Sequence, residues 1–191
     1  SNLYVITSNL GNIKEAGELP ERMPDGTNGV VYSIGEDKAL RYYRFDEVRG
    51  AWVETSGGGF SSIKNMPVEV YYDVEKSDWV LNEEPFAGRL AGDVDNNPDP
   101  EFVGWGITGI SSYQGRLVLL SGSYVWLSAS SMPRLFYRTT LEELLDTDPI
   151  GIGSSSATSA SFQYAVNFNK DLLLFSSEHQ ALIAGGNTPI T

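Results

Sequence analysis

The sequence contains no cysteine, which excludes disulfide bonds and metal sites built from thiolates. It contains a single histidine, His179, and no G-x-S-x-G or H-E-x-x-H motif accompanies it. We therefore interpret His179 as a residue of a hairpin turn rather than as a catalytic group. No apolar run reaches the length of a membrane span, and no charged segment followed by an apolar one opens the chain.

Basic residues are scarce: 13 Lys and Arg stand against 25 Asp and Glu, for a formal net charge of −12. An acidic surface repels phosphate, so ordinary nucleic-acid binding is disfavoured, whereas a surface past which DNA slides without sticking is compatible with it. The 191 residues, 41% of them hydrophobic, are enough for one sizeable core or two small ones. Because the chain begins at Ser1 without a methionine, we expect it to be a piece of a longer polypeptide.

What is present is a series of short apolar runs separated by Gly, Asn, Asp and Ser, the pattern of β-strands and turns. One short helix is expected at 139–146, where Thr140 and Glu143 form a capping box and Pro149 prevents continuation. The small polar segment 151–161 is interpreted as a loop. Strands are expected at 3–7, 29–34, 38–45, 50–55, 68–74, 77–83, 107–113, 116–121, 124–129, 162–168, 171–176 and 179–184.

A repeat with an offset of 168 − 113 = 55 relates residues 113–128 to residues 168–183. In each copy an aromatic residue ends one strand, a polar two-residue turn follows, and then comes a run of four apolar residues closed by serine. A third strand ends in Leu127 in one copy and in Leu182 in the other. Each copy therefore predicts a three-stranded antiparallel meander whose central strand is buried on both faces.

Repeated meanders of this length are typical of propeller blades. The expected fold class is therefore all-β, a partial β-propeller with a small β-rich accessory domain and one short helix. Two blades cannot close a ring, so either more blades lie outside the chain or the two sheets pack as a sandwich. The expected domains are an accessory region at 1–64, a strand pair with an acidic crossover at 65–106, and two blades at 107–191.

The acidic stretch "GDVDNNPDPEFVG" at 92–104 resembles the start of a calcium loop, since Asp93, Asp95 and Asn97 fit the first ligand positions of an EF-hand. Pro98 stands where the sharp-turn glycine is required, and Gly104 stands where the bidentate glutamate belongs. The favoured interpretation is a rigid crossover between two β regions, in which Asx side chains hold their own backbone. The weak metal candidates are Asp93, Asp95, Asn97 and Asp99; no catalytic or cofactor-binding residue is predicted.

Several other side chains could in principle carry chemistry, but structural roles are favoured for them. The carboxylate pairs Glu83-Glu84 and Asp146-Asp148 could serve a glycosidase, and Trp79, Trp105 and Trp126 could stack on sugars. Aromatic residues in strands more often form cores and cross-strand pairs. The glycine-rich segments 56–60 and 151–156 lack the Lys-Ser/Thr pair of a phosphate loop, so they are interpreted as connectors.

An ordered series of motifs resembles the tail tubular protein B, or nozzle, family of short-tailed bacteriophages. The series covers roughly residues 65–191, whereas 1–64 match only loosely. The motifs are "NMPVEVYY" (65–72), a tryptophan with acidic residues (79–84), "GDVDNNPDPEFVGWGITGI" (92–110), "YQGRLVLLSGSYVWLSAS" (113–130), "FYRTTLEELLDTDPIGI" (136–152) and "AVNFNKDLLLFSSEHQALIAG" (165–185). The family proteins are several times longer, so the resemblance implies that this chain is a central fragment.

The resemblance implies a non-enzymatic structural role in the virion tail, without cofactors. Nozzle subunits form a ring, commonly hexameric, that contacts an adaptor or tubular protein and tail fibres, and DNA passes through its channel without specific binding. Assembly in the host bacterial cytoplasm, from a phage or prophage gene, is implied as well. The alternatives are a phage-tail propeller that binds or hydrolyses glycans, which needs paired carboxylates in a common cleft, and a calcium-stiffened binding module.

Overall fold

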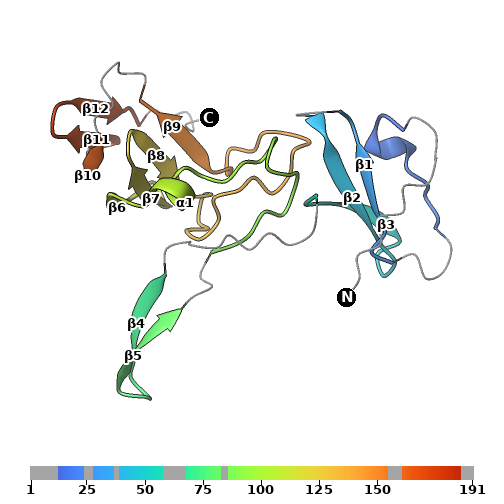
Figure 1. The fold of residues 1–191 in the computed structure, drawn as a ribbon, viewed down its shortest axis with the longest axis horizontal. Coiled ribbons are helices and arrows are strands. Elements are labelled where there is room, and N and C mark those ends of the chain that lie inside the picture. Colours follow the sequence, from blue (N-terminus) through green and yellow to red (C-terminus); the bar gives the residue numbers. More distant parts are fainter. Residues whose placement is uncertain are drawn as a thin grey trace. The chain divides into compact units, whose positions relative to one another are not determined.

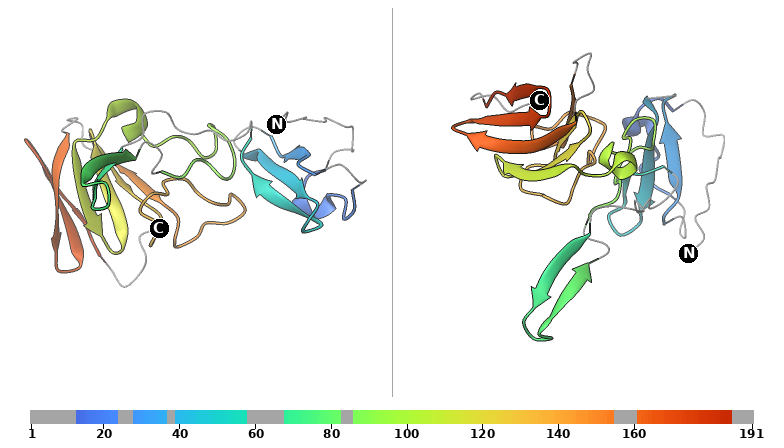
Figure 2. Two further views of the ribbon diagram at one scale, coloured as in Figure 1. Left: turned by 90° about the horizontal axis from the view of Figure 1, so that it is seen from below. Right: turned by 60° about the vertical axis from the view of Figure 1, so that its left-hand side comes forward.

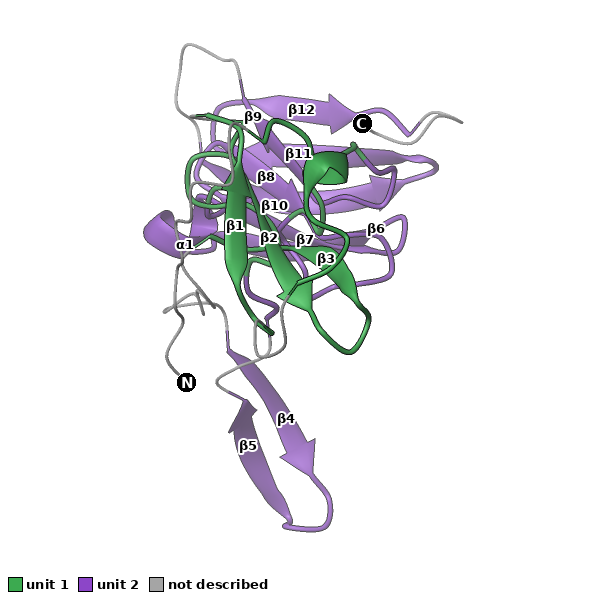
Figure 3. Ribbon diagram, turned by 90° about the vertical axis from the view of Figure 1, so that its right-hand side faces the viewer, with its two compact units in different colours: residues 1–61, 89–98, 138–144 green, residues 62–88, 99–137, 145–191 purple. Residues whose placement is uncertain are grey.

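The structure is a computed structural model that describes residues 13–23, 28–36, 39–57, 68–82, 86–154 and 161–185. The chain divides into two compact units, shown in green and purple in Figure 3. Unit 1 contains residues 1–61, 89–98 and 138–144, and unit 2 contains residues 62–88, 99–137 and 145–191. In the described residues the regular secondary structure of both units is almost entirely antiparallel strand, which confirms the expected all-β class; the partial β-propeller stays a prediction.

Unit 1 contains a three-stranded sheet of order β1-β2-β3, with β1 at Val31–Ile34, β2 at Arg41–Asp46 and β3 at Ala51–Thr55. Alternate residues of β2 point to the core, so Tyr43 and Phe45 are buried while Arg44 between them is exposed. A 3₁₀ turn, η1 at Ala16–Glu18, precedes the sheet. The core of this unit joins the residues Leu19, Ile34 and Tyr43, with Ile13, Ala16, Tyr32 and Trp52 packed against them.

Unit 2 contains a hairpin, a short helix and two larger sheets (Figure 1). The hairpin pairs β4 (Glu69–Asp73) with β5 (Asp78–Asn82), and the helix is α1 (Phe102–Trp105). The first sheet has the order β6-β7-β8-β9 and the second the order β10-β11-β12. Their strands are β6 (Gly109–Tyr113), β7 (Arg116–Ser121), β8 (Tyr124–Leu127), β9 (Ile150–Gly153), β10 (Phe162–Phe168), β11 (Asp171–Ser176) and β12 (Gln180–Ile183).

The two larger sheets pack face to face, as the left view of Figure 2 shows, and their side chains form one hydrophobic core. The first sheet contributes Val118, Leu120 and Leu127 to this core, and the second contributes Leu172 and Leu174. Hydrogen bonds also join the sheets: the Tyr113 hydroxyl donates to the carbonyl of Lys170 (2.6 Å), Asn167 Nδ2 to Ser112 O (2.7 Å), and Thr108 Oγ1 to Phe162 O (2.6 Å).

Equivalent residues of the repeat do not face each other across the shared core. In the first sheet they point toward the second sheet, and in the second sheet they point away from the first. In the first sheet Val118 pairs with Leu127, and both side chains lie in the shared core. Their equivalents Leu173 and Leu182 also pair, but lie on the face of the second sheet that points away from the first. A sandwich related by a two-fold axis would bring equivalent faces together. The sheets are instead stacked head to tail, as units of a repeating series are.

Two expectations for local structure were wrong. Residues 139–146 form bends and a turn instead of a helix. Thr140 Oγ1 accepts from Glu142 N (3.1 Å), as a cap would, but Thr140 Oγ1 and Leu141 N also donate to the distant Glu54 carboxylate (2.5 and 2.9 Å), which holds the segment in this conformation. The short helix lies at 102–105 instead. The start of the expected loop 151–161 belongs to strand β9, paired with β8. The expected strand at 3–7 lies outside the described residues.

Of the helices in the described segments, none combines the length and the apolar composition that crossing a bilayer requires.

Candidate functional site

The acidic stretch 92–104 is divided between the two units, with the boundary after Pro98. In unit 1, Asp93 holds its own turn: its Oδ1 accepts hydrogen bonds from the backbone N–H groups of Asp95 (2.9 Å) and Asn96 (3.3 Å). Its Oδ2 accepts the hydroxyl proton of Tyr42 on β2 (2.8 Å). Burial, followed by this bond to the Asp93 carboxylate, raises the pKa of Tyr42 to about 12. Asp93 therefore attaches the crossover to the sheet of unit 1.

The asparagines continue this attachment. Asn96 accepts from the Asp93 N–H (2.8 Å) and donates to the carbonyl of Leu40 before β2. Asn97 is buried and donates to the carbonyls of Ala91 (2.8 Å) and Arg138 (3.0 Å), while its Oδ1 accepts from Arg138 N (3.2 Å). All the hydrogen-bonding groups of its amide are thus directed to backbone.

In unit 2, two further acids of the stretch bind aromatic side chains. Asp99 Oδ1 accepts from the Tyr137 hydroxyl (2.8 Å), and Glu101 Oε2 accepts from Trp126 Nε1 (2.5 Å). Of the weak metal candidates, Asp95 and Asp99 are solvent-exposed, Asp93 is partly exposed and Asn97 is buried. Among the residues that the structure describes, no three His, Asp or Glu side chains gather as a metal site requires. The described geometry of the stretch is that of a structural crossover, and calcium binding by Asp93, Asp95, Asn97 and Asp99 stays an untested prediction.

Of the remaining candidates, His179 and Asp148 make structural hydrogen bonds. His179 lies in the turn between β11 and β12, where its N–H donates to Ser176 Oγ (2.8 Å). Asp148 is buried and its Oδ2 accepts from Leu145 N (3.0 Å). The Glu83-Glu84 pair lies outside the described residues. Trp105 is exposed at the end of α1.

Unit 2 contains a cleft of about 800 Å³ where the β6–β7 turn meets the β10–β11 turn. Arg116 and Lys170 line it together with polar residues such as Gln114 and Asn167, and none of its lining residues carries a carboxylate. Arg116 is buried and donates to the carbonyls of Ser128 (2.7 Å), Asp148 (2.6 Å) and Asp146 (2.7 Å). Burial lowers the pKa of Arg116, and the Asp148 carboxylate opposes this effect. The cleft lacks the carboxylate pair that glycoside hydrolysis uses.

The β4–β5 hairpin separates apolar from charged residues on its two faces. Directly paired residues share a face, and Val70 pairs with Leu81 while Tyr72 pairs with Trp79. These four side chains form what we call the apolar face, and each is between 48% and 68% exposed. The Tyr72 and Trp79 rings meet edge to face, with centroids 5.5 Å apart. The opposite face presents the residues Glu69, Tyr71, Asp73, Asp78, Val80 and Asn82.

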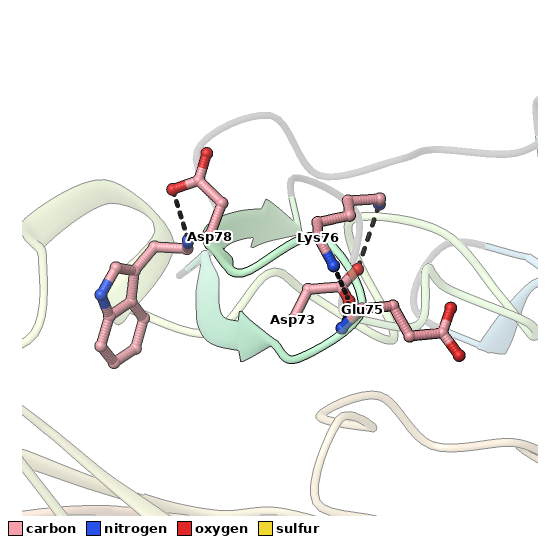
Figure 4. A network of polar contacts seen from close by, with 5 residues as sticks. Asp73, Glu75, Lys76 and Asp78 are labelled. Carbon is pink, nitrogen blue, oxygen red and sulfur yellow. Dashed lines mark hydrogen bonds and ion pairs between the residues drawn. The ribbon is translucent and has the colours of Figure 1, made fainter.

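Polar contacts on the hairpin lie at its turn and on its charged face. Figure 4 shows the turn, where Asp73 Oδ1 accepts from the N–H groups of Glu75 (3.0 Å) and Lys76 (3.2 Å). Lys76 Nζ lies 3.2 Å from Asp73 Oδ2, and these contacts with Lys76 lower the pKa of Asp73. At the other end of the hairpin, Arg134 pairs with Glu69. Two carboxylates of the hairpin, Asp73 and Glu69, are therefore paired with cations, whereas the apolar face is exposed to solvent.

The structure leaves a second apolar surface uncovered, on the far face of the β10–β12 sheet. Tyr164, Val166, Phe168 and Leu182 are exposed there. Sequence reasoning located the strands that carry both surfaces but assigned neither of them a role. In both strands of the hairpin three apolar or aromatic residues stand between polar ends, a local pattern that predicts the strands but not which face stays exposed.

The comparisons with known proteins agree with the resemblance of the motifs. The family model of the bacteriophage nozzle protein matches residues 3–191, and this range includes 3–64, where only a loose match was expected. The tail tubular protein gp12 of Escherichia phage T7 is 30% identical over 181 residues, which cover 90% of this chain and 22% of that protein. The chain thus spans about a fifth of the length of this curated relative. On this evidence, the chain belongs to the bacteriophage nozzle protein family.

Proposed function

We propose that this chain is part of a structural tail subunit of a short-tailed phage, and that copies of the subunit form a ring through which DNA leaves the virion. The observation that carries the proposal is the match of the nozzle family model along residues 3–191. The relative's name, tail tubular protein, supports an oligomeric tail assembly. The described acids support a role without catalysis, because Asp93, Asp99 and Glu101 each hold the fold together.

The head-to-tail stacking of the two larger sheets supports a propeller-like arrangement of blades over 107–191. The far face of β10–β12 is the repeat equivalent of the face that the first sheet uses to bind the second. A third meander of the longer polypeptide would cover it by the same packing. In this proposal 1–64 is an accessory region and 65–106 carries the strand pair and the crossover.

The charge of the chain suits a channel for DNA. With a net charge of −12, its surface repels phosphate and offers few cations to hold it, so DNA passes with little adhesion. The remaining partners in this proposal are copies of the subunit, an adaptor or tubular protein next to the ring, and tail fibres. Assembly would take place in the host bacterial cytoplasm, from a phage or prophage gene.

The test is the oligomeric state of the complete protein together with its affinity for DNA. Light scattering and negative-stain electron microscopy should find rings with an open channel. Binding to double-stranded DNA should be undetectable at physiological salt, because a net-negative surface has no counterion release to gain. A strictly monomeric complete protein, or one that binds DNA tightly, would contradict the proposal.

A further inference from the structure

We infer that a fourth antiparallel strand, supplied by the same polypeptide beyond residue 191, pairs with the outer edge of β12. The inference rests on the blade arrangement proposed above and says how the second blade is completed. The first sheet has four strands, in the order β6-β7-β8-β9. The second has three described strands, β10-β11-β12, although β12 is the repeat equivalent of β8. β8 is paired on both sides, by β7 and β9, whereas the described strands pair with β12 on the β11 side alone.

The backbone of β12 presents hydrogen-bonding groups along its outer edge. A residue in an antiparallel ladder exchanges hydrogen bonds with the same neighbouring strand at every second position. At the turn before β12, Ser176 N donates to His179 O (2.9 Å), so the next residue bonded to β11 is Ala181. The N–H and C=O groups of Gln180 and Leu182 therefore point away from β11. An exposed row of such groups is a template for a further strand.

In the first copy of the repeat the same edge is occupied. Directly beyond the β8–β9 ladder, Ser154 N donates to Ser123 O (2.9 Å), so the alternation places the backbone groups of Val125 and Leu127 on the β9 side. Their equivalents, 55 residues later, are the two β12 residues whose groups point away from β11. The edge that β12 presents is thus the one that β9 binds in the first copy.

The path of the chain after β12 points to the same polypeptide as the source of the strand. Arg116, the first residue of β7, donates to the carbonyl of Ser128 directly after β8 (2.7 Å). Its equivalent Asp171, the first residue of β11, accepts from the N–H of Gly185 shortly after β12 (2.9 Å). In both copies the first residue of the central strand therefore holds the chain that leaves the third strand. In the first copy this chain returns to pair as β9, and a tethered strand reaches an edge more readily than a separate molecule does.

The repeat also gives the place and the register of the fourth strand. β9 covers Ile150–Gly153, and the offset of 55 moves this range to 150 + 55 = 205 and 153 + 55 = 208. Trp126 on β8 pairs with Gly151 on β9, so the equivalent residue of β12, Ala181, is expected opposite position 151 + 55 = 206. A Cβ at position 151 would lie 2.7 Å from the Trp126 ring. Ala181 is much smaller than Trp126, so position 206 has room for a side chain.

Hydrogen exchange of the complete, unchanged protein tests whether the edge is paired. The amide hydrogens of Gln180 and Leu182 should exchange at least about 100-fold more slowly than in an unstructured peptide, because ladder bonds protect them. The amide of Ala181, bonded on the β11 side, is the internal control. Mass spectrometry with electron-transfer fragmentation resolves the three residues. Exchange of Gln180 and Leu182 at the rate of the peptide, whether or not Ala181 is protected, would overturn the inference.

Cysteine pairs in the complete protein identify what occupies the edge. Facing residues of antiparallel strands have Cα atoms about 4.5 to 5.5 Å apart, within the range that a disulfide spans. Ala181→Cys or Leu182→Cys is combined with one cysteine at each position from about 200 to about 212, because connections between strands vary in length. Ala181→Cys should oxidise with a position near 206, and Leu182→Cys with the position before it. Mass spectrometry of mixed ¹⁴N-labelled and ¹⁵N-labelled protein should find both joined peptides with one label.

Three results of the cysteine scan would overturn the inference. Disulfides that combine the two labels would mean that a second copy fills the edge. A partner position that moves forward from Ala181→Cys to Leu182→Cys would mean a parallel strand, and no disulfide at any scanned position would mean a different segment. The proposed function is tested separately, by the ring itself. If the complete protein forms no ring but shows the expected disulfides, the proposed function fails and the fourth strand stands. If it forms a ring without them, the ring stands and the fourth strand is refuted.

Discussion

The two larger sheets of unit 2 share a repeat but differ in what covers them. The β6–β9 sheet is packed on both faces: the shared core covers one, and a cluster of Phe102, Leu119 and Phe136 covers the other. The β10–β12 sheet is packed on one face, and Tyr164, Phe168 and Leu182 are exposed on the other. The two copies have similar sequences but different neighbours. What decides whether a strand residue is buried is therefore whether another element covers its face of the sheet.

The largest difference between the two sheets is expected for substitutions of the equivalent leucines Leu127 and Leu182. Leu127 is 1% exposed in the shared core, whereas Leu182 is 56% exposed on the open face. Leu127→Ala should lower the free energy of unfolding by about 3 kcal/mol, since it opens a cavity. Leu182→Ala should change it by less than about 0.5 kcal/mol. Urea unfolding of the 191-residue chain measures both, and equal losses would mean that the two faces are covered alike.

The next largest effect is expected at Arg116, whose repeat equivalent is Asp171. The Arg116 guanidinium joins the start of β7 to three carbonyl groups of the connection between β8 and β9. Arg116→Met should cost about 2 kcal/mol of unfolding free energy, because buried carbonyl groups lose a charged donor.

Arg134→Ala is the control for the Arg116 variant. Arg134 is half-exposed, and it pairs with Glu69 at the hairpin. Its removal should cost less than about 1 kcal/mol, as exposed ion pairs contribute little. If the Arg116 and Arg134 variants were equally stable, the three hydrogen bonds from Arg116 would not be what holds the connection between β8 and β9 in place.

A smaller effect is expected from the hydroxyl that joins the two sheets. Tyr113 on β6 donates to the carbonyl of Lys170, and burial, followed by the charge of Asp171, raises the pKa of Tyr113. A pKa raised by folding means that the neutral form is stabilised in the native state. This stabilisation is complete below the ordinary tyrosine pKa of about 10 and is lost as the pH rises through the native value.

Tyr113→Phe should therefore cost about 1 kcal/mol at neutral pH and decline less in stability than the unchanged chain above pH ~10. Urea unfolding at a series of pH values provides the measurement. Tyr42 and Tyr43 in unit 1, whose pKa values are raised to about 12, titrate in both proteins and serve as the internal reference. If the free energy of unfolding of the variant had the same pH dependence as that of the unchanged chain, Tyr113 would not contribute to the loss of stability at alkaline pH.

The same comparison explains which parts of the fold the sequence could predict. Strands β7, β10 and β11 have the expected bounds, because runs rich in apolar and aromatic residues between polar turns are a local signal. Strand β9 was missed because it contains Gly151 and Gly153. These glycines face aromatic rings on β8: a Cβ at position 151 would lie 2.7 Å from the Trp126 ring. Glycine there makes room for a neighbour, which the local sequence does not reveal.

The sequence could predict the structural character of the acidic stretch 92–104, but not the residues that it contacts. That the acidic stretch is a crossover followed from Pro98 and from the Asx side chains. That Asp93 binds Tyr42, 51 residues earlier, did not follow, since a single sequence carries no information about pairs so far apart. The expected helix at 139–146 was wrong for the same reason, because the hydrogen bonds of Thr140 Oγ1 and Leu141 N to the distant Glu54 could not be read from the sequence.

The smallest predicted effect compares the two turns at the same place in the repeat. Gln114 and Asn169 both have left-handed backbone conformations, with φ values of 47° and 55°. Asparagine tolerates this region better than glutamine, because its short side chain bonds locally and clashes less with the backbone. Gln114→Asn should therefore raise the free energy of unfolding by about 0.5 kcal/mol, and Asn169→Gln should lower it by a similar amount. Changes of opposite sign in the free energy of unfolding, measured with urea, would show that both turns keep the backbone geometry of the repeat, although one sheet is covered on both faces and the other on one. Equal signs would mean that contacts around each turn outweigh its backbone preference, since the Gln114 amide also donates to the Tyr113 hydroxyl (3.1 Å).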